Sequence, residues 1–327
     1  YEVIRPIHNV PQLSGRATHV WLVRRKDVYY VLKDSWPLAS KPFSEIRHLL
    51  KINQTILQNP TMYDKLKHTY PILVIGQELL DDTGVYRKSL QDTFFSRVHR
   101  RIVTKPIGDP LTSFRSKYEL CSVLCDVVKY LEFSSQVCSV CHGDISLSNV
   151  TIHRIFCGYN DKEINVFATP AEADIVTATP TEAGIVTASP TEAGIVTASP
   201  TEAGIDKNTV RNDNNLTDSD DGTLPYMALE SLKWVLPSEF THEPRHDLES
   251  LFYVILTLCT YVNYAGCLRS PIALDDELSV CLNEWWATLD GHVLVRNKAQ
   301  HIALLDDLVL QRLPPYWEDF HPYLRAL

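Results

Sequence analysis

A tandem array of ten-residue repeats interrupts the chain and limits where a folded core can be built. The segments ATPAEADIVT, ATPTEAGIVT, ASPTEAGIVT and ASPTEAGID follow one another from Ala168 to Asp206. Each repeat offers at most an Ile-Val pair for burial, and its period matches none of the common solenoids. We therefore expect a disordered, low-complexity surface loop rather than a small stacked β-structure. The Asn- and Asp-rich residues that follow extend this predicted insertion over about 168–221.

The remaining residues are enough for two ordinary domains, or for one domain with two lobes and an insertion. The chain has 327 residues, of which 45% are hydrophobic, and this length and composition are typical of a globular protein. Eight cysteines without a visible secretory signal favour reduced thiols and an intracellular location, in the cytoplasm, the nucleus or both. The Cys138–Cys141 CxxC pair has no second ligand pair, so we interpret it as two partly buried side chains rather than a zinc site.

The charge of the chain argues against two classes of partner. The net charge is -9 and the isoelectric point is near 5.7, and Lys and Arg form no long run. These features give no general attraction to nucleic acid or to an anionic membrane. The longest apolar run, Leu251 to Val262, is too short to cross a bilayer and predicts a buried helix. We expect neither nucleic acid nor a membrane as a partner.

Hydrophobic periodicity predicts an α+β fold. Residues 1–105 are expected to form a small β-rich lobe with one helix, which follows Pro42. Its predicted strands are His19–Arg24, Val28–Leu32, Ile72–Gly76 and Arg100–Lys105. Residues 106–327 are expected to form a larger, mostly helical lobe. Its predicted helices are Ser116–Ser134, His246–Tyr261, Glu277–Leu289 and Ala299–Leu310.

The strongest chemical signal is the segment CHGDISLSNV. It places Asp144 two residues after His142 and five residues before Asn149, and an apolar strand-like run follows. Phosphoryl transfer uses a carboxylate to accept the proton of the attacking hydroxyl, and an amide oxygen to hold a metal on the phosphates. The pattern HxDxxxxN supplies both groups.

Further motifs occur before and after this segment. Upstream, Lys33 ends a predicted hairpin strand, and Glu45 in the next helix is its natural ion-pair partner. Downstream, GTLPYMALE contains Thr223 and Glu230, and HDLES places Asp247 at the start of the long apolar helix. The order of these motifs along the chain, rather than any one of them, makes the pattern specific.

Together these motifs resemble the fungal-type protein kinase domain family over nearly the whole chain. The resemblance rests on the segments VLKDSWP, SEIRHLL, KPIGDPLTSF, HGDISLSNV, GTLPYMALE and HDLESLFYVIL. It implies a bilobal protein-kinase-like fold, the cofactors ATP and Mg²⁺, and phosphoryl transfer to Ser or Thr of a protein substrate. It also implies an adenine pocket at the hinge, near Val103 to Ile107.

The resemblance assigns a role to each motif residue. Lys33 pairs with the α- and β-phosphates and Glu45 holds it in place, while Asp144 in the loop of His142 is the catalytic base and Asn149 a metal ligand. Asp247 hydrogen-bonds the backbone of that loop. Thr223 and Glu230 belong to the activation segment. These assignments are expectations from the resemblance.

Three features depart from the family pattern. Gly143 stands where protein kinases commonly carry Arg, and the glycine-rich loop is reduced to Gly15 and its two neighbours. The strand after the catalytic loop, expected over Ile164–Pro170, should end in a metal-binding Asp, but it continues directly into the repeats. Asp174 and Asp206 are the substitutes that we consider.

The sequence leaves three functions open. The leading hypothesis is a Ser/Thr protein kinase. The second is a pseudokinase, a binding or scaffold module for a partner protein whose metal site is broken. The third is a small-molecule phosphotransferase, since HGD also occurs in those enzymes. GTLPYMALE argues against the third function, because such enzymes lack this peptide-positioning segment.

Overall fold

The computed structural model groups the chain into two compact units. The residues that it describes are 1–9, 17–39, 45–66, 68–86, 96–154, 175–178, 223–233, 240–269, 284–285, 288 and 290–327. The first unit comprises Tyr1–Leu111, Ser116–Val140 and Ser148–Val186, and the second comprises Thr112–Arg115, Cys141–Leu147 and Thr187–Leu327. The predicted lobe boundary between residues 105 and 106 stays a prediction.

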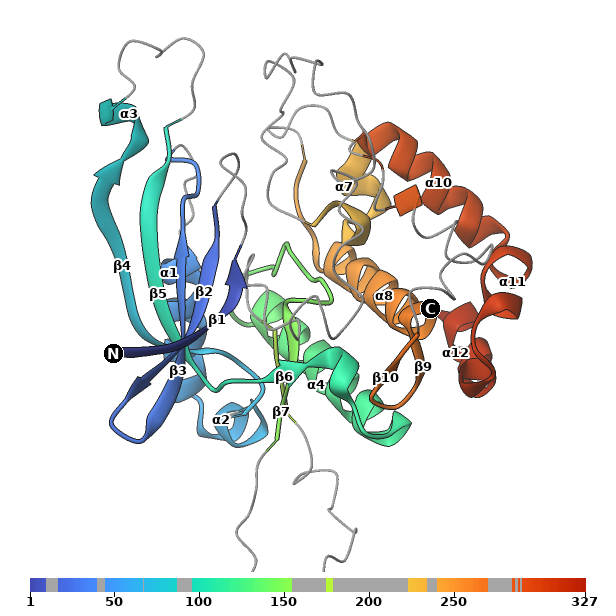
Figure 1. Ribbon diagram of the computed structural model, residues 1–327, viewed down its shortest axis with the longest axis horizontal. Helices are drawn as coiled ribbons and strands as arrows, with labels where there is room; N and C mark the ends of the chain where they lie inside the picture. The colour runs from blue at the N-terminus through green and yellow to red at the C-terminus, as the bar shows by residue number, and fades with distance from the viewer. Residues whose placement is uncertain are drawn as a thin grey trace, which may run out of the picture. The chain divides into compact units, whose positions relative to one another are not determined.

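An antiparallel five-stranded sheet forms the first part of the first unit (Figure 1). In sheet order its strands are β1 (Glu2–Asn9), β2 (His19–Arg25), β3 (Val28–Ser35), β5 (Val98–Lys105) and β4 (Ile72–Asp82). Arg25 pairs with Val28, so a two-residue turn joins β2 and β3. Lys26 in this turn has a φ of 54°, the left-handed conformation that two-residue hairpins use.

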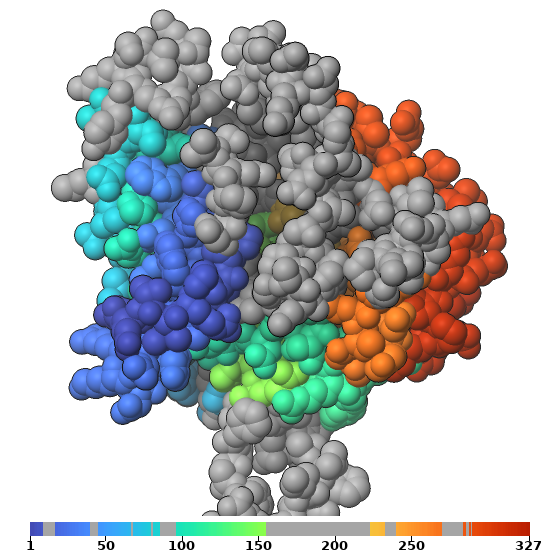
Figure 2. Space-filling model, in the orientation of Figure 1, coloured from blue at the N-terminus to red at the C-terminus, as the bar shows by residue number. Residues whose placement is uncertain are grey.

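Strand β1 is the element of this sheet for which the sequence analysis gives no bounds. It spans eight residues and contains Pro6, which has no N–H to donate and is therefore tolerated at a sheet edge. Figure 2 shows β1 in dark blue at the surface of its unit, in agreement with the exposure of Glu2–Pro6.

The described residues between 1 and 105 form three helices rather than the one predicted. They are α1 (Glu45–Leu57), α2 (Pro60–Leu66) and α3 (Thr83–Tyr86). The single predicted helix corresponds to α1, whose Leu49, Ile52 and Ile56 are buried at helical spacing. The side chain of Asn53 donates to Pro71 O at 3.0 Å and accepts from Leu73 N at 2.8 Å, which fastens α1 to the start of β4. The two shorter helices carry too few periodic residues to predict.

The rest of the first unit combines a long helix with a small sheet. Helix α4 (Lys117–Gln136) begins where predicted, and Ser116 caps it by accepting from Glu119 N. The strands β6 (Asp109–Pro110), β7 (Val150–His153) and β8 (Ile175–Ala178) form an antiparallel sheet in that order. Arg154 donates to Glu119 at 2.8 Å and to Asp109 at 2.7 Å, and so connects α4, β6 and the end of β7.

Strand β8 corrects the sequence analysis in two ways. Its residues lie in the first repeat, so the predicted loop begins with a strand at this point. The partner of β7 is therefore Ile175–Ala178, whereas the strand expected over Ile164–Pro170 lies outside the described residues. The physical reason is that an Ile-Val pair with neighbouring Thr has high β-propensity. The low overall hydrophobicity of the repeats concealed this local preference.

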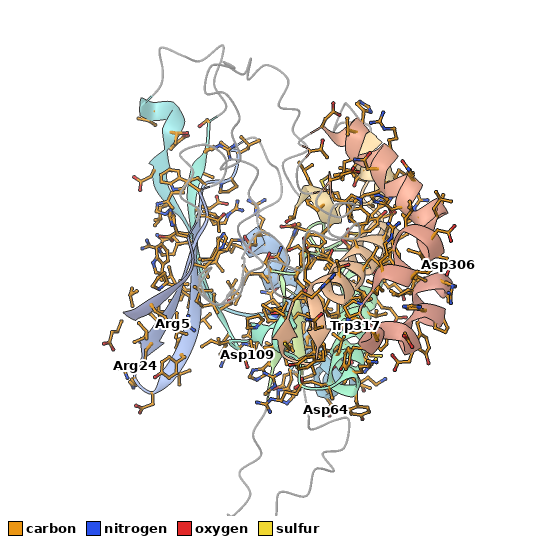
Figure 3. All side chains as sticks on the ribbon, turned by 45° about the vertical axis from the view of Figure 1, so that its right-hand side comes forward. Arg5, Arg24, Asp64, Asp109, Asp306 and Trp317 are labelled. Carbon is orange, nitrogen blue, oxygen red and sulfur yellow. The ribbon has the colours of Figure 1, made fainter. Side chains whose placement is uncertain are left out.

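Helices dominate the second unit. They are α7 (Leu229–Lys233), α8 (Pro244–Tyr261), α10 (Gly291–Ala303), α11 (Leu305–Leu308) and α12 (His321–Ala326). Strands β9 (Val262–Tyr264) and β10 (Cys267–Leu268) form a hairpin, and η2 (Leu111–Ser113), η4 (Leu224–Tyr226), η7 (Leu310–Arg312) and η8 (Pro315–Phe320) are short 3-10 turns. Trp317, labelled in Figure 3, is fully buried and donates to Val262 O at 2.7 Å.

Two predicted helices of this unit have different outcomes. The helix predicted over Ala299–Leu310 is wrong in its bounds, because α10 ends at Ala303 and begins at Gly291. Asp290 caps α10 by accepting from two backbone amides, and this capping signal was overlooked in favour of apolar spacing. The helix predicted over Glu277–Leu289 lies largely outside the described residues.

Within the described part of the chain, no helix combines the length and apolar character needed to cross a bilayer. The buried helix predicted from the run Leu251 to Val262 corresponds to the second half of α8.

Candidate active site

The structure brings together Lys33 of β3 and Glu45 of α1. The ammonium of Lys33 donates to both carboxylate oxygens of Glu45, each at 3.0 Å. Both side chains are about 5% exposed. Glu45 is the first residue of α1, where the positive end of the helix dipole favours a carboxylate. A buried pair with good geometry on both oxygens fixes the position of the ammonium.

An apolar cluster and a hollow lie beside β1 in the same unit. Ile7, Val20 and Val31 are buried together, and Leu22 and Ile107 pack against them. The hollow has a volume of about 330 Å³ and is lined by Ile4, Arg5, Ile7, Leu22, Tyr29, Ile107, Gly108 and Asp109. Figure 3 labels Arg5 and Asp109, the two oppositely charged residues of this lining.

The predicted hinge residues occupy two different places. Ile107 lines the hollow, whereas Val103 lies in the core of the sheet, where it pairs with Leu32 and is 2% exposed. The physical reason is that β5 continues to Lys105, so Val103 still belongs to the strand. Gly15, the other residue predicted to contact nucleotide, lies outside the described residues.

Gly108 keeps the chain close to β7 just after the hinge. A Cβ added to this residue would lie 2.2 Å from Oγ1 of Thr151, so only glycine fits. His153 of β7 contacts Ile107 O through Nδ1 at 3.2 Å. Burial lowers the pKa of His153 despite that contact, which favours the neutral ring. The close approach of Gly108 to Thr151 and the contact of His153 with Ile107 fix the chain where Ile107 and Asp109 line the hollow.

The predicted catalytic loop contacts Asp247 of α8 in the second unit. The carboxylate of Asp247 accepts from His142 N at 2.8 Å and from Gly143 N at 2.9 Å. His242 contacts the same carboxylate at 2.9 Å. Burial alone would raise the pKa of Asp247, but the hydrogen bonds and charge of its partners outweigh burial and lower that pKa. An ionised Asp247 therefore shapes the loop.

The structure explains the departure at Gly143. This residue has a φ of +80°, the left-handed region that other residues rarely adopt. An added Cβ would meet nothing within 4 Å, so conformation rather than space favours glycine here. The bend turns the chain so that its two adjacent amides, those of His142 and Gly143, both reach Asp247.

Asp144 is held by Thr223, which we predict to belong to an activation segment, in the same unit. It is 3% exposed, and its Oδ1 accepts from Thr223 N at 2.9 Å and from Thr223 Oγ1 at 3.0 Å. His142 Nδ1 accepts from the Asp144 amide at 3.3 Å. A carboxylate and a threonine hydroxyl thus lie in direct contact, a geometry suited to orienting a hydroxyl for proton transfer.

The rest of the activation segment packs on α8. Tyr226 is buried, and burial raises its pKa, so the phenol stays protonated. Glu230 contacts His246 at 3.0 Å and Arg245 at 2.8 Å, both from the first turn of α8. The structure therefore brings the predicted residues Thr223 and Glu230 onto two different partners, the catalytic loop and α8.

The described residues do not make a complete magnesium site. Asn149, 1% exposed, directly precedes β7 and belongs to the first unit. Within the described ranges, no group of three or more His, Cys, Asp or Glu side chains is arranged to hold a metal ion, whereas Mg²⁺ takes an octahedral set of oxygens. Asp174 and Asp206 lie outside the described residues. Asn149 therefore remains the one described metal ligand that we predict.

The bounds of β8 bear on which Asp could take the place of the metal-binding Asp of the family pattern. The family pattern expects the metal-binding Asp after this strand. Asp174 directly precedes β8, and the next Asp in the sequence after Ala178 is Asp206, at the end of the repeats. Asp174 is thus on the wrong side of the strand for the family role, which leaves Asp206 as the substitute in the expected order.

Sequence reasoning overlooked several polar residues that build this site. His242 contacts Asp247, Glu249 accepts from Leu229 N at 2.8 Å, and Lys298 donates to Met227 O at 2.7 Å. Glu249 lies within HDLES, but the sequence analysis assigned it no role, and His242 and Lys298 lie outside every motif. The CxxC cysteines are both reduced thiols, and burial raises the pKa of Cys141 to about 11, which makes it a poor nucleophile.

These features, a β-sheet unit with a buried Lys-Glu pair and a helical unit with a carboxylate on a scaffolded loop, define a protein-kinase-like chain. Comparison with known families agrees. The family described as "Fungal protein kinase" matches residues 1–71 and 58–259. The chain belongs to this family, whose fold is of the α+β, kinase-like class.

Two further comparisons add little. No curated protein matches the chain. Among solved structures, the chain is similar to the kinase PK-1 of Cydia pomonella granulovirus, at 11% sequence identity, over 90% of this chain and 92% of that chain, with a TM-score of 0.39. A likeness this distant supports no argument about residues or activity.

Proposed function

We propose that the chain transfers the γ-phosphoryl group of ATP to a Ser or Thr hydroxyl of a protein. The observation that carries the proposal is the setting of Asp144. This buried carboxylate contacts the hydroxyl of Thr223, and Asp247 holds the amides of the two residues before it. Such a carboxylate orients an acceptor hydroxyl and takes its proton as the phosphoryl group transfers.

Other residues support the binding of the nucleotide. The buried ammonium of Lys33, fixed by Glu45, supplies a positive charge for the phosphates, and the hollow beside Ile107 offers an apolar surface to the adenine. Mg²⁺, which would neutralise charge on the phosphates, has a candidate ligand in Asn149. We further propose an intracellular protein as the acceptor, with neither nucleic acid nor membrane as a partner.

The test is the substitution Asp144→Asn, measured with γ-labelled ATP and myelin basic protein as a generic acceptor. We expect phosphate transfer to fall by about 10²-fold or more, while ADP binding, measured by calorimetry, stays within about twofold. The exposed Asp307→Asn, with the same change of charge, is the matched control. Equal transfer by Asp144→Asn and the parent chain would refute the role of Asp144.

A specific observation favours a second function, that of a pseudokinase. No Asp follows β8 before Asp206, so the second metal ligand of an active kinase is missing from its usual place. On this proposal the chain binds a partner protein and transfers no phosphate. ADP binding that gains nothing from Mg²⁺, together with no transfer by the parent chain, would support it.

A further inference from the structure

Lys298 of α10 is completely buried, and its surroundings in the second unit are unusual for a charged side chain. Its exposed fraction is 0%. Nζ donates to Met227 O at 2.7 Å, lies 3.6 Å from the centroid of the Tyr253 ring, and lies 5.5 Å from that of Trp285. An aromatic face attracts a cation, and a backbone oxygen accepts its hydrogen bond. These contacts favour the ammonium at its buried position.

Glu249 of α8 binds the same stretch of backbone two residues further along the chain. Its Oε1 accepts from Leu229 N at 2.8 Å and from the Tyr253 hydroxyl at 2.7 Å. Leu229 is the first residue of α7, whose amide has no partner within its own helix. The carbonyl of Met227 and the amide of Leu229 flank Ala228, which is buried. Two charged side chains from two helices thus hold a three-residue segment by its backbone.

This segment lies within GTLPYMALE, four residues beyond the threonine that contacts Asp144. In Figure 1, α7 lies alongside α10. The chain changes from extended backbone at Met227 to helix at Leu229, and such a transition leaves backbone groups that need partners from elsewhere. Lys298 and Glu249 supply them.

We propose that Lys298 and Glu249 form a clamp, the 298–249 clamp, that positions residues 227–229 to receive the acceptor protein. This inference rests on the proposed function, because it assigns these two residues to acceptor binding rather than to chemistry. They are positioning residues, since neither contacts Asp144. The clamp contacts only the backbone of this segment, and the side chain of Met227 is partly exposed.

The competing explanation is that Lys298 only fills space in the core. The variant Lys298→Met distinguishes this explanation from the clamp. Met has a similar length and no charge, and replacing a buried charge with an apolar group is often neutral or stabilising. If Lys298 only packs, this variant keeps its Tm and its activity. If it clamps, the Met227 carbonyl loses its donor and the segment loosens, even where Tm is unchanged.

The experiment uses the full chain and three variants, with two readouts. Hydrogen exchange is followed by mass spectrometry in peptides that cover residues 224–232. Transfer from γ-labelled ATP is followed at varied myelin basic protein. For Lys298→Met we expect exchange in that peptide to accelerate about tenfold, and KM for the acceptor to rise about tenfold. We expect kcat and KM for ATP to stay within about twofold. Glu249→Gln keeps an acceptor oxygen and should give a smaller change in the same direction.

Lys129→Met, on the exposed face of α4, is the matched control and should change neither readout. Wild-type exchange and an unchanged acceptor KM in Lys298→Met would overturn the clamp. Acceleration of exchange throughout the unit would overturn it too, since that result indicates general destabilisation. A parent chain that transfers no phosphate refutes the proposed function and the acceptor role of the clamp. Exchange at residues 224–232 then still decides whether the clamp holds the segment.

Discussion

Lys33 and Lys298 are both buried, one in each unit, yet they use their charge differently. Lys33 donates to both oxygens of one carboxylate at 3.0 Å, whereas Lys298 donates to a backbone carbonyl and rests on an aromatic ring. A carboxylate balances the charge of the first ammonium, for which we propose a phosphate as a second anionic partner. The second ammonium has its contacts satisfied by neutral groups. Burial of a lysine therefore does not reveal its role, but the charge of its partner does.

The strongest way to test this comparison is to remove Lys33. Lys33→Met should reduce phosphate transfer by at least about 10²-fold, because it removes the positive charge that we propose for the phosphates. It should also destabilise the chain by about 3–5 kcal/mol, because Glu45 is left buried without its cation. Urea unfolding and the labelled-ATP assay measure the two effects.

The double variant Lys33→Met/Glu45→Leu separates the loss of phosphate transfer from the loss of stability. It should recover most of the stability, since both charges are gone, but none of the transfer. The exposed Lys51→Met, on the surface of α1, is the control. Recovery of transfer in the double variant would show that Lys33 acts only through stability. The proposed difference in role between Lys33 and Lys298 would then be wrong.

Whether the sequence predicts the partners of a buried lysine depends on how close those partners lie along the chain. Lys33 ends a strand and Glu45 begins a helix, so their meeting follows from the order of two elements and one motif. The partners of Lys298 come from α8 and from the segment around Met227, which are distant in sequence. A lysine in mid-helix resembles a solvated surface residue until tertiary packing is known.

The same limit explains the errors in the fold. Helical spacing predicted α1 and α4, and a continuous apolar run predicted α8, which is buried on all sides over Tyr253–Tyr261. Neither pattern predicted the bounds of β1, whose Pro suits only an edge strand, or of β8, which gains its stability from pairing with β7. Pairing partners are long-range information. Short strands therefore stay hidden wherever their own residues are ambiguous.

The next largest effect should appear in the pH dependence of the free energy of unfolding, to which Lys298 contributes. Burial lowers the pKa of Lys298 well below its ordinary value of 10.5, although the charge of Glu249 opposes this shift. Tyr253, the other titratable group facing it, has its pKa raised by burial and stays protonated. Between the folded pKa and 10.5 the unfolded chain binds more protons, so stability rises with pH.

This rise should reach at most about 1.4 kcal/mol per pH unit. It should be missing in Lys298→Met and present in Lys51→Met. Urea unfolding curves recorded from neutral pH to about pH 10 measure it. If the free energy of unfolding of Lys298→Met changes with pH as steeply as that of the parent, Lys298 keeps its ordinary pKa. The contacts with the ring and the carbonyl would then offset the whole cost of removing the ammonium from water.

The smallest expected effect comes from Tyr253→Phe, which tests whether the ring or the hydroxyl supports Lys298. The substitution keeps the aromatic face 3.6 Å from Nζ and removes only the hydroxyl that donates to Glu249. Glu249 still accepts from Leu229, so we expect a loss of only about 1 kcal/mol in the free energy of unfolding. The pH slope assigned to Lys298 should be unchanged, because the ring and the burial that set it remain. Loss of that slope in Tyr253→Phe would instead show that the hydroxyl, acting through Glu249, governs the charge of Lys298.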